Sequence, residues 1–216
     1  MEVVRSIDIE PEEVEILRLL GRAADPGKAR QWTVNLVREA VEEARSLVEP
    51  QGVYGFFDRD DVPGHVVFDS AERVGLCVCT IGPRLEGRVY ELMSSGELAK
   101  GVVLDAVGSE AAEAAARWMD ERMAGEESPG GLRPSGRFSP GYGQWTLEGQ
   151  RLIFDLLDAG PIGVHLSRSM MMTPRKSVSF AMNFGSDPIP PRCETPCERC
   201  TQEDCIYRRE QGNAAR

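Results

Sequence analysis

The chain has 216 residues, of which 41% are hydrophobic and 28% are charged. This composition supplies enough apolar surface for a core and excludes a mainly disordered chain. With 35 acidic and 25 basic residues the formal charge is -10, which disfavours general binding to nucleic acid or to an anionic membrane. No apolar stretch reaches the roughly 18–20 residues of a membrane span, and residues 1–8 lack the features of a signal peptide. We therefore expect a cytoplasmic protein.

The N-terminal third predicts two helices followed by three strands. Pro11 stands where a first helical residue fits, and we interpret the acidic stretch 2–15 as a solvated helix face. Valines recur on one face between Thr33 and Val48, which predicts a second helix there. Three apolar runs then predict strands at Val53–Phe57, His65–Asp69 and Val74–Ile81.

The remainder of the chain predicts a helical middle followed by two further strands. Arg84–Met93 is expected to be helical, and an alanine-rich helix follows as far as Met123, which Gly108-Ser109 can divide into two parts. Its many small residues allow close packing, so this helix is expected to be central. The later elements are a loop at 125–143, a helix from Thr146, and strands at Ile162–Ser169 and Val178–Phe184.

These elements predict an α+β fold, in which helices flank an antiparallel or mixed sheet. Strands that lie before and after a helical middle disfavour a regular βαβ alternation. The apolar pattern ends near Gly185, so we expect one domain over 1–185 and an irregular metal-binding tail over 186–216. A tail of this length is too short to fold alone without a metal or another cross-link.

The tail carries four cysteines in the pattern C-x3-C-x2-C-x4-C, at Cys193, Cys197, Cys200 and Cys205. In a reducing compartment such a cluster indicates a metal rather than disulfides. The compact spacing favours a four-iron iron–sulfur cluster. Structural zinc and uncoordinated thiols are the alternatives. The metal would either cross-link the tail or transfer electrons. Cys77 and Cys79, on one face of a predicted strand, are expected to pack in the core rather than to perform redox chemistry.

The loop Arg137-Phe138-Ser139-Pro140-Gly141-Tyr142-Gly143 is the candidate ligand site. Pro-Gly fixes a turn and lets the backbone approach a ligand closely. Arg137 offers a planar fork for a carboxylate, and Tyr142 and Trp145 offer aromatic faces for a cation. Such a loop can clamp a small zwitterion, although these residues also fit a capped turn before a helix.

Several motifs in this order resemble the activation domain of cobalamin-dependent methionine synthase. The central ones are Arg137-x-x-Pro140-Gly141-Tyr142 and Ser169-Met170-Met171-Met172-x-Pro174-x-x-Ser177-Val178-Ser179. Upstream segments resemble stand-alone members of the family: Thr80-Ile81-Gly82, Leu104-Asp105-Ala106-x-Gly108-Ser109 and Ala112-Glu113-Ala114. The resemblance covers roughly residues 70–185 and implies a curved sheet-and-helix domain.

The resemblance implies that the chain binds S-adenosylmethionine and presents its methyl group to an oxidised corrinoid. One electron plus that methyl group restores methylcobalt. Arg137 would hold the methionyl carboxylate, the main chain from Phe138 to Tyr142 would line the ligand, and Glu113 would take the ammonium group or the ribose. No residue is assigned a catalytic role. Because the corrinoid-binding motif Asp-x-His-x-x-Gly is absent, cobalamin would arrive on a partner, either a corrinoid-binding protein or a cobalamin-dependent methyltransferase.

Three functions stay open at this point. The first is a reactivation partner that serves methionine synthesis or another methyl transfer, with an iron–sulfur tail as the electron donor. The second is a non-catalytic module that docks on a corrinoid protein and has a structural zinc tail. The second is favoured by the segment from Asn183 to Pro188, which replaces the family's His-Pro and tyrosine-rich stretch. The third is a metal-sensing or zinc-stapled accessory domain. Met170-Met171-Met172 is expected to fill gaps in the core, the alternative being a surface facing the corrinoid.

Overall fold

A five-stranded antiparallel sheet lies at the centre of the protein, with strand order β1-β2-β3-β7-β4. The structure is a computed structural model that describes residues 1–21, 30–63, 66–127 and 131–186. The strands of the sheet are β1 (Glu2–Val4), β2 (Gln51–Asp58), β3 (Arg73–Thr80), β4 (Arg133–Pro134) and β7 (Ser177–Gly185). A small second sheet pairs β5 (His165–Leu166) with β6 (Met172–Thr173). The predicted α+β class with an antiparallel sheet is confirmed.

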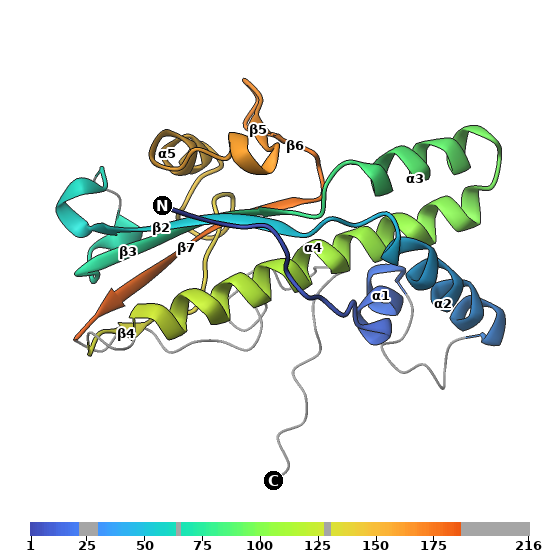
Figure 1. Cartoon of the computed structure of the whole chain (residues 1–216), viewed down its shortest axis with the longest axis horizontal. Coiled ribbons are helices and arrows are strands. Elements are labelled where there is room, and N and C mark those ends of the chain that lie inside the picture. The colour runs from blue at the N-terminus through green and yellow to red at the C-terminus, as the bar shows by residue number, and fades with distance from the viewer. Residues whose placement is uncertain (22–29, 64–65, 128–130, 187–216) are drawn as a thin grey trace, which may run out of the picture.

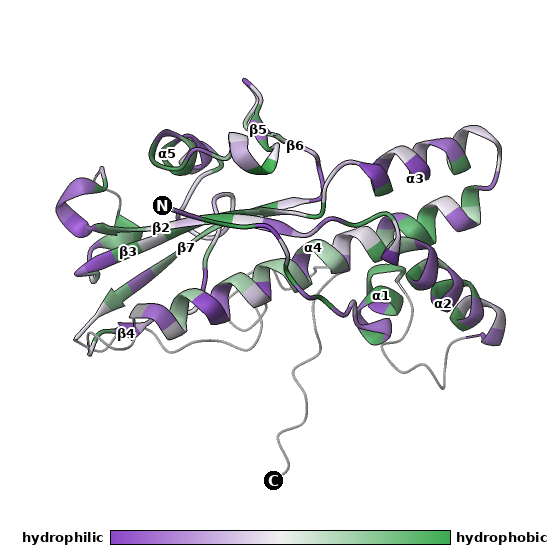
Figure 2. Cartoon of the chain, in the orientation of Figure 1, coloured by the Kyte–Doolittle hydropathy of each residue, from purple (hydrophilic) through white to green (hydrophobic). Residues whose placement is uncertain are grey.

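Helices cover both faces of the sheet (Figure 1). The long helix α4 runs along one face, with α1 and α2 packed beside it, while α5 lies on the other face. The helices are α1 (Glu13–Leu19), α2 (Gln31–Arg45), α3 (Arg84–Ser94), α4 (Leu98–Glu127) and α5 (Gly149–Leu156). In Figure 2 helix α2 has a hydrophobic and a hydrophilic face, and the hydrophobic one packs on the core around α4.

The strands β2, β3 and β7 have long apolar runs because they are covered on both sides. On the face under α4 lie Tyr54, Cys77 and Phe180, which stand opposite one another in the register. On the other face Ala181 belongs to the cluster that surrounds Trp145. Cys77 and Cys79 are buried free thiols, which confirms their predicted place in the core.

Helix α4 approaches the sheet closely because small residues line the contact. Its alanines at 111, 112 and 114–116 are buried. A Cβ atom on Gly52 would lie 2.7 Å from Met119 Sδ, so the glycine makes room for the helix. The helix is continuous from Leu98 to Glu127, and the predicted division at Gly108-Ser109 is wrong. Gly108 instead allows contact with α3, because a Cβ atom there would lie 2.5 Å from Leu85 Cδ2.

Two predicted strands are largely wrong. Within His65–Asp69, residues Val66–Phe68 form a 3₁₀ turn, which buries Phe68 without an adjacent strand edge. Within Ile162–Ser169, only His165–Leu166 is a strand. A 3₁₀ turn ends the preceding segment, and Gly163 at φ 70° redirects the chain there.

The acidic N-terminal stretch is not a solvated helix face. Glu2 lies in strand β1, and its carboxylate is 2.6 Å from Arg122 Nη2. Glu15 is buried in α1 and pairs with Arg18 at 2.8 Å. The acidic stretch departs from the predicted solvated face because basic residues of α4 pair with it. Arg117 of this helix pairs with Glu12, at 3.5 Å. These contacts attach the N-terminal segment to the central helix.

Three of the sequence motifs meet where β3 ends and β7 begins. The buried Lys176 Nζ donates to Ser109 Oγ at 2.8 Å and lies 2.8 Å from Asp105 Oδ1. Ser177 Oγ donates to Thr80 Oγ1 at 2.9 Å. Charge-assisted bonds in a buried setting are stronger than surface pairs. The motif residues thus join both strands to helix α4.

Replacing Lys176 with methionine is expected to lower the free energy of unfolding by about 1.5–3 kcal/mol, because Asp105 and Ser109 lose a buried charged partner. Urea denaturation measures this change. The matched control is Lys100→Met, since Lys100 pairs with Glu97 at an exposed position, where the expected change is below about 1 kcal/mol. Equal effects of the two substitutions would contradict a structural role for this junction.

Candidate functional site

The candidate loop begins as an extension of the sheet along the outer edge of β7. Ser135 N donates to Asn183 O at 2.7 Å. Phe138 N donates to Ala181 O at 3.0 Å, and Ala181 N donates back to Phe138 O at 2.8 Å. Neighbouring residues of an extended chain point to opposite faces, so Arg137 and Phe138 diverge. Arg137 therefore reaches under α4, and Phe138 reaches toward α5.

The predicted site residues Arg137 and Glu113 meet in the structure. Arg137 Nη2 donates to Glu113 Oε2 at 2.6 Å, although the two residues are 24 positions apart. The guanidinium carbon also lies 5.8 Å from the centre of the Phe180 ring. The Arg137 side chain is 14% exposed, whereas that of Glu113 is 47% exposed. The edge of the sheet thus carries a mostly buried cation whose carboxylate partner reaches solvent.

The surroundings of Arg137 keep it charged. Burial by itself lowers the pKa of Arg137, but the charge of Glu113, the hydrogen bond to Glu113 and the charge of Asp120 raise this pKa above its usual value. Nearby, burial raises the pKa of the Cys77 thiol well above its ordinary value, so this thiol stays neutral. The arrangement can hold a carboxylate on Arg137, because the half-exposed Glu113 is the group that a ligand anion would exchange with.

On the opposite face the side chain of Phe138 belongs to an aromatic cluster. The ring centroid of Phe138 lies 5.9 Å from that of Phe68 and 5.5 Å from that of Trp145. Trp145 was predicted to offer a ligand an aromatic face, but it is buried, and that expectation is wrong. These rings fix the direction in which the loop leaves the sheet, and hence the position of Arg137.

Residues 139–143 form a tight turn that presents one aromatic ring. Tyr142 N donates to Ser139 O at 3.3 Å, and Gly141 N donates to Trp145 O at 2.7 Å. Gly141 has φ +92°, a conformation that favours glycine. Pro140 is buried. Tyr142 is 66% exposed, so its ring is the accessible aromatic surface of the turn.

Two residues of the site were missed by sequence reasoning. Asp120 follows Glu113 by seven positions on α4 and therefore lies on the same helix face. Phe180 lies beneath the Arg137 guanidinium. The helical spacing of the two carboxylates was a usable signal. The contact with Phe180 depends on tertiary structure, so the sequence carries no local signal for it.

The other predicted groups lie elsewhere. The predicted metal ligands Cys193, Cys197, Cys200 and Cys205 lie outside the described residues. Among the residues that the structure describes, no group of three or more His, Cys, Asp or Glu could hold a metal ion. The prediction that Met170-Met171-Met172 fills the core holds only in part, because Met172 packs on the core and Met171 is exposed.

Comparison with known proteins supports the fold. No family model and no curated protein matches the chain. Among solved structures the chain is similar to the MetH reactivation domain bound to AdoHcy, with a TM-score of 0.57 and 19% sequence identity. The similarity covers 74% of this chain and 66% of that one, so the chain spans about two thirds of the length of its neighbour. The fold expected from the sequence motifs is therefore confirmed.

Over the described ranges, no helix combines the length and the apolar character that a membrane crossing requires.

Proposed function

We propose that this protein binds S-adenosylmethionine at the edge of its sheet and helps to remethylate the corrinoid of a partner methyltransferase. Two findings support the proposal. The fold is that of a reactivation domain which binds AdoHcy, the demethylated form of this methyl donor. The observation that carries most weight is the Arg137 cation, held at the sheet edge in the loop that carries the Arg-x-x-Pro-Gly-Tyr motif.

The residues at this edge fit the chemical groups of the proposed ligand. Arg137 is the cation for the methionyl carboxylate. Once the ligand carboxylate has replaced Glu113 as the partner of Arg137, the carboxylate of Glu113 is available to the ammonium group or the ribose. The exposed Tyr142 ring offers a face to a cationic sulfonium. We further propose that the main chain from Phe138 to Tyr142 lines the ligand.

The reaction requires little chemistry from the chain itself. One electron reduces cob(II) to cob(I), and the methyl group then moves from sulfur to cobalt, which releases AdoHcy. The sulfonium supplies an activated methyl group. The residues of this chain hold the charged end of the methyl donor and orient it toward the partner, an advantage that comes from positioning. The partner would be a corrinoid-binding protein or a cobalamin-dependent methyltransferase.

This function is tested with a methionine synthase fragment that lacks its own reactivation domain and carries cob(II)alamin. The fragment is mixed anaerobically with this protein, S-adenosylmethionine and titanium(III) citrate, and methylcobalamin is followed by absorbance. We expect methylcobalamin only when this protein and S-adenosylmethionine are both present. Its absence, under conditions in which an intact methionine synthase is reactivated, would contradict the proposal.

For the tail, we propose an iron–sulfur cluster on Cys193, Cys197, Cys200 and Cys205, which would deliver the electron. The support is the spacing of the cysteines alone. Protein purified without oxygen is expected to contain about four iron and four sulfide per chain. Cys200→Ser is expected to lower both contents, whereas Cys77→Ala, in the buried core, should leave them unchanged. Zinc in place of iron would contradict this proposal and favour the docking module with a structural zinc tail.

A further inference from the structure

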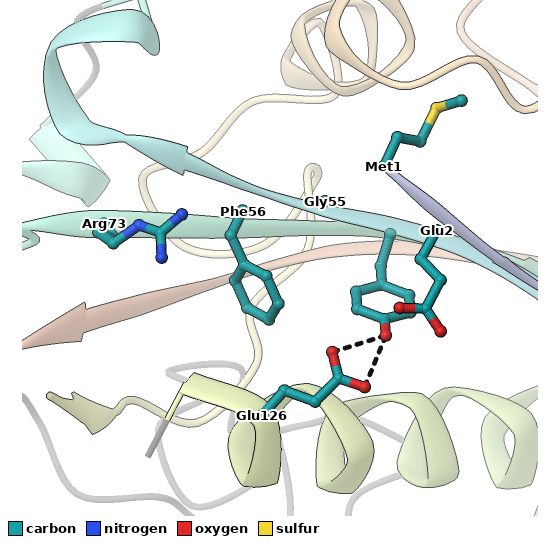
Figure 3. Close-up of a pocket in the computed structure, with 7 residues that line it drawn as sticks. Met1, Glu2, Gly55, Phe56, Arg73 and Glu126 are labelled. Carbon is teal, nitrogen blue, oxygen red and sulfur yellow. Dashed lines mark hydrogen bonds between the residues drawn. The ribbon is translucent and has the colours of Figure 1, made fainter. Parts of the chain in front are cut away.

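A hollow lies away from the Arg137 edge, between the C-terminal end of α4 and the strands β1, β2 and β3 (Figure 3). Its volume is about 270 Å³, and its lining residues are Met1, Glu2, Tyr54, Gly55, Phe56, Arg73 and Glu126. Glu113 and Glu126 are separated by 13 positions on the same helix, which is about 20 Å along its axis. The hollow is therefore separate from the ligand site proposed above.

One end of the hollow carries two carboxylates, those of Glu2 and Glu126. Tyr54 Oη donates to the two carboxylate oxygens of Glu126 at 2.7 and 2.6 Å. Arg122, which does not line the hollow, lies 2.6 Å from Glu2 and 3.0 Å from Glu126. Burial, and next the hydrogen bond to Glu126, raise the pKa of Tyr54, so this hydroxyl stays a donor. Arg122 thus holds both carboxylates in place, and Tyr54 also holds that of Glu126.

The other end of the hollow is cationic, and an aromatic ring lies between the two ends. Arg73 Nε is 3.4 Å from Asp58 Oδ1, and the guanidinium carbon is 5.8 Å from the centre of the Phe56 ring. Phe56 is fixed by edge contacts to Tyr54 and Phe184, at centroid distances of 5.8 and 5.4 Å. Figure 3 shows the Phe56 ring between Arg73 and the two carboxylates.

We propose that this hollow binds a small zwitterion whose ammonium and carboxylate groups stand at the two ends of a short apolar chain. Its ammonium group would face Glu2 and Glu126, its carboxylate would face Arg73, and its apolar part would lie on Phe56. The volume is below the roughly 300–1,000 Å³ of pockets for drug-sized ligands, which suits a ligand smaller than S-adenosylmethionine. A metal ion is disfavoured, because no group of three or more metal-binding side chains occurs here among the described residues.

The probe for this site is 5-aminopentanoate, titrated into the full chain and followed by the amide NMR signals of the lining residues. We expect saturable shifts at Glu2, Phe56 and Arg73. n-Butylamine, which lacks the carboxylate, and pentanoate, which lacks the ammonium group, are each expected to bind at least about tenfold more weakly, since each loses one charge-assisted contact.

Two variants test the two ends separately. Glu126→Gln keeps an acceptor for Tyr54 but removes a charge, and Arg73→Gln removes the cation; each is expected to raise the Kd for 5-aminopentanoate about tenfold. The controls are Glu121→Gln on the same helix and Arg45→Gln on α2, neither of which lines the hollow. No saturation by 5-aminopentanoate, or an unchanged Kd in both test variants, would overturn the proposal. Neither result bears on binding at Arg137.

Discussion

Replacing Arg137 with alanine is expected to weaken the binding of S-adenosylmethionine by about 1.5–3 kcal/mol, or about 10- to 150-fold in Kd. The reason is the setting of this side chain. It is mostly buried, it stays charged, and it faces a carboxylate that reaches solvent. A ligand carboxylate bound there would gain a charge-assisted contact partly shielded from water. Isothermal titration calorimetry of the two proteins measures the difference.

The matched control for this prediction is Arg133→Ala. Arg133 lies on the same edge, in β4, and its exposed side chain donates to Ser186 O. This substitution should leave ligand binding unchanged. A urea titration of Arg137→Ala separates lost affinity from lost folding, because Glu113 loses its partner in this variant. If folded Arg137→Ala binds as tightly as the wild type, the ligand site does not include this arginine.

The largest effect on stability is expected at Gly149, the first residue of α5. A Cβ atom there would lie 2.1 Å from Trp145 Nε1 and 2.5 Å from its Cε2. Trp145 is buried against Phe68 and Phe138, so the indole cannot move aside. Gly149→Ala is expected to lower the free energy of unfolding by about 3 kcal/mol, the upper end of the range for overpacking. Because the same rings hold the loop, binding of S-adenosylmethionine should weaken too.

The comparison for Gly149 is the same substitution at Gly87, on the exposed face of α3. Nothing lies within 4 Å of a Cβ atom there, and alanine favours a helix over glycine by about 0.5–1 kcal/mol. Gly87→Ala is therefore expected to stabilise the protein, with the opposite sign. Equal thermal midpoints for the two variants would show that Trp145 does not restrict this position.

Sequence patterns predicted the elements that are buried on both sides. The apolar runs around Val53, Val74 and Val178 needed no knowledge of their partners to be recognised as strands. The run at His65–Asp69 was of the same kind, yet Val66 is exposed and the described part of this segment is a turn. A short apolar run does not reveal whether an edge is available for pairing.

The candidate site was predictable only in part, because local sequence does not reveal which distant residues meet in the fold. Arg137 and Glu113 were proposed from separate motifs, but their contact depends on how α4 crosses the sheet. Asp120 and Phe180 complete the surroundings of Arg137; the helical spacing from Glu113 pointed to Asp120, whereas no local pattern pointed to Phe180. The motif residues Asp105 and Ser109, by contrast, contact Lys176 at a structural junction.

The central claim is that this chain binds S-adenosylmethionine. The most direct test is calorimetric titration of anaerobically prepared protein with S-adenosylmethionine and, separately, with AdoHcy. We predict saturable binding of one ligand per chain in both titrations, and competition between the two ligands. An absence of binding heat for both, with the protein folded by circular dichroism, would contradict the claim while leaving the fold as described.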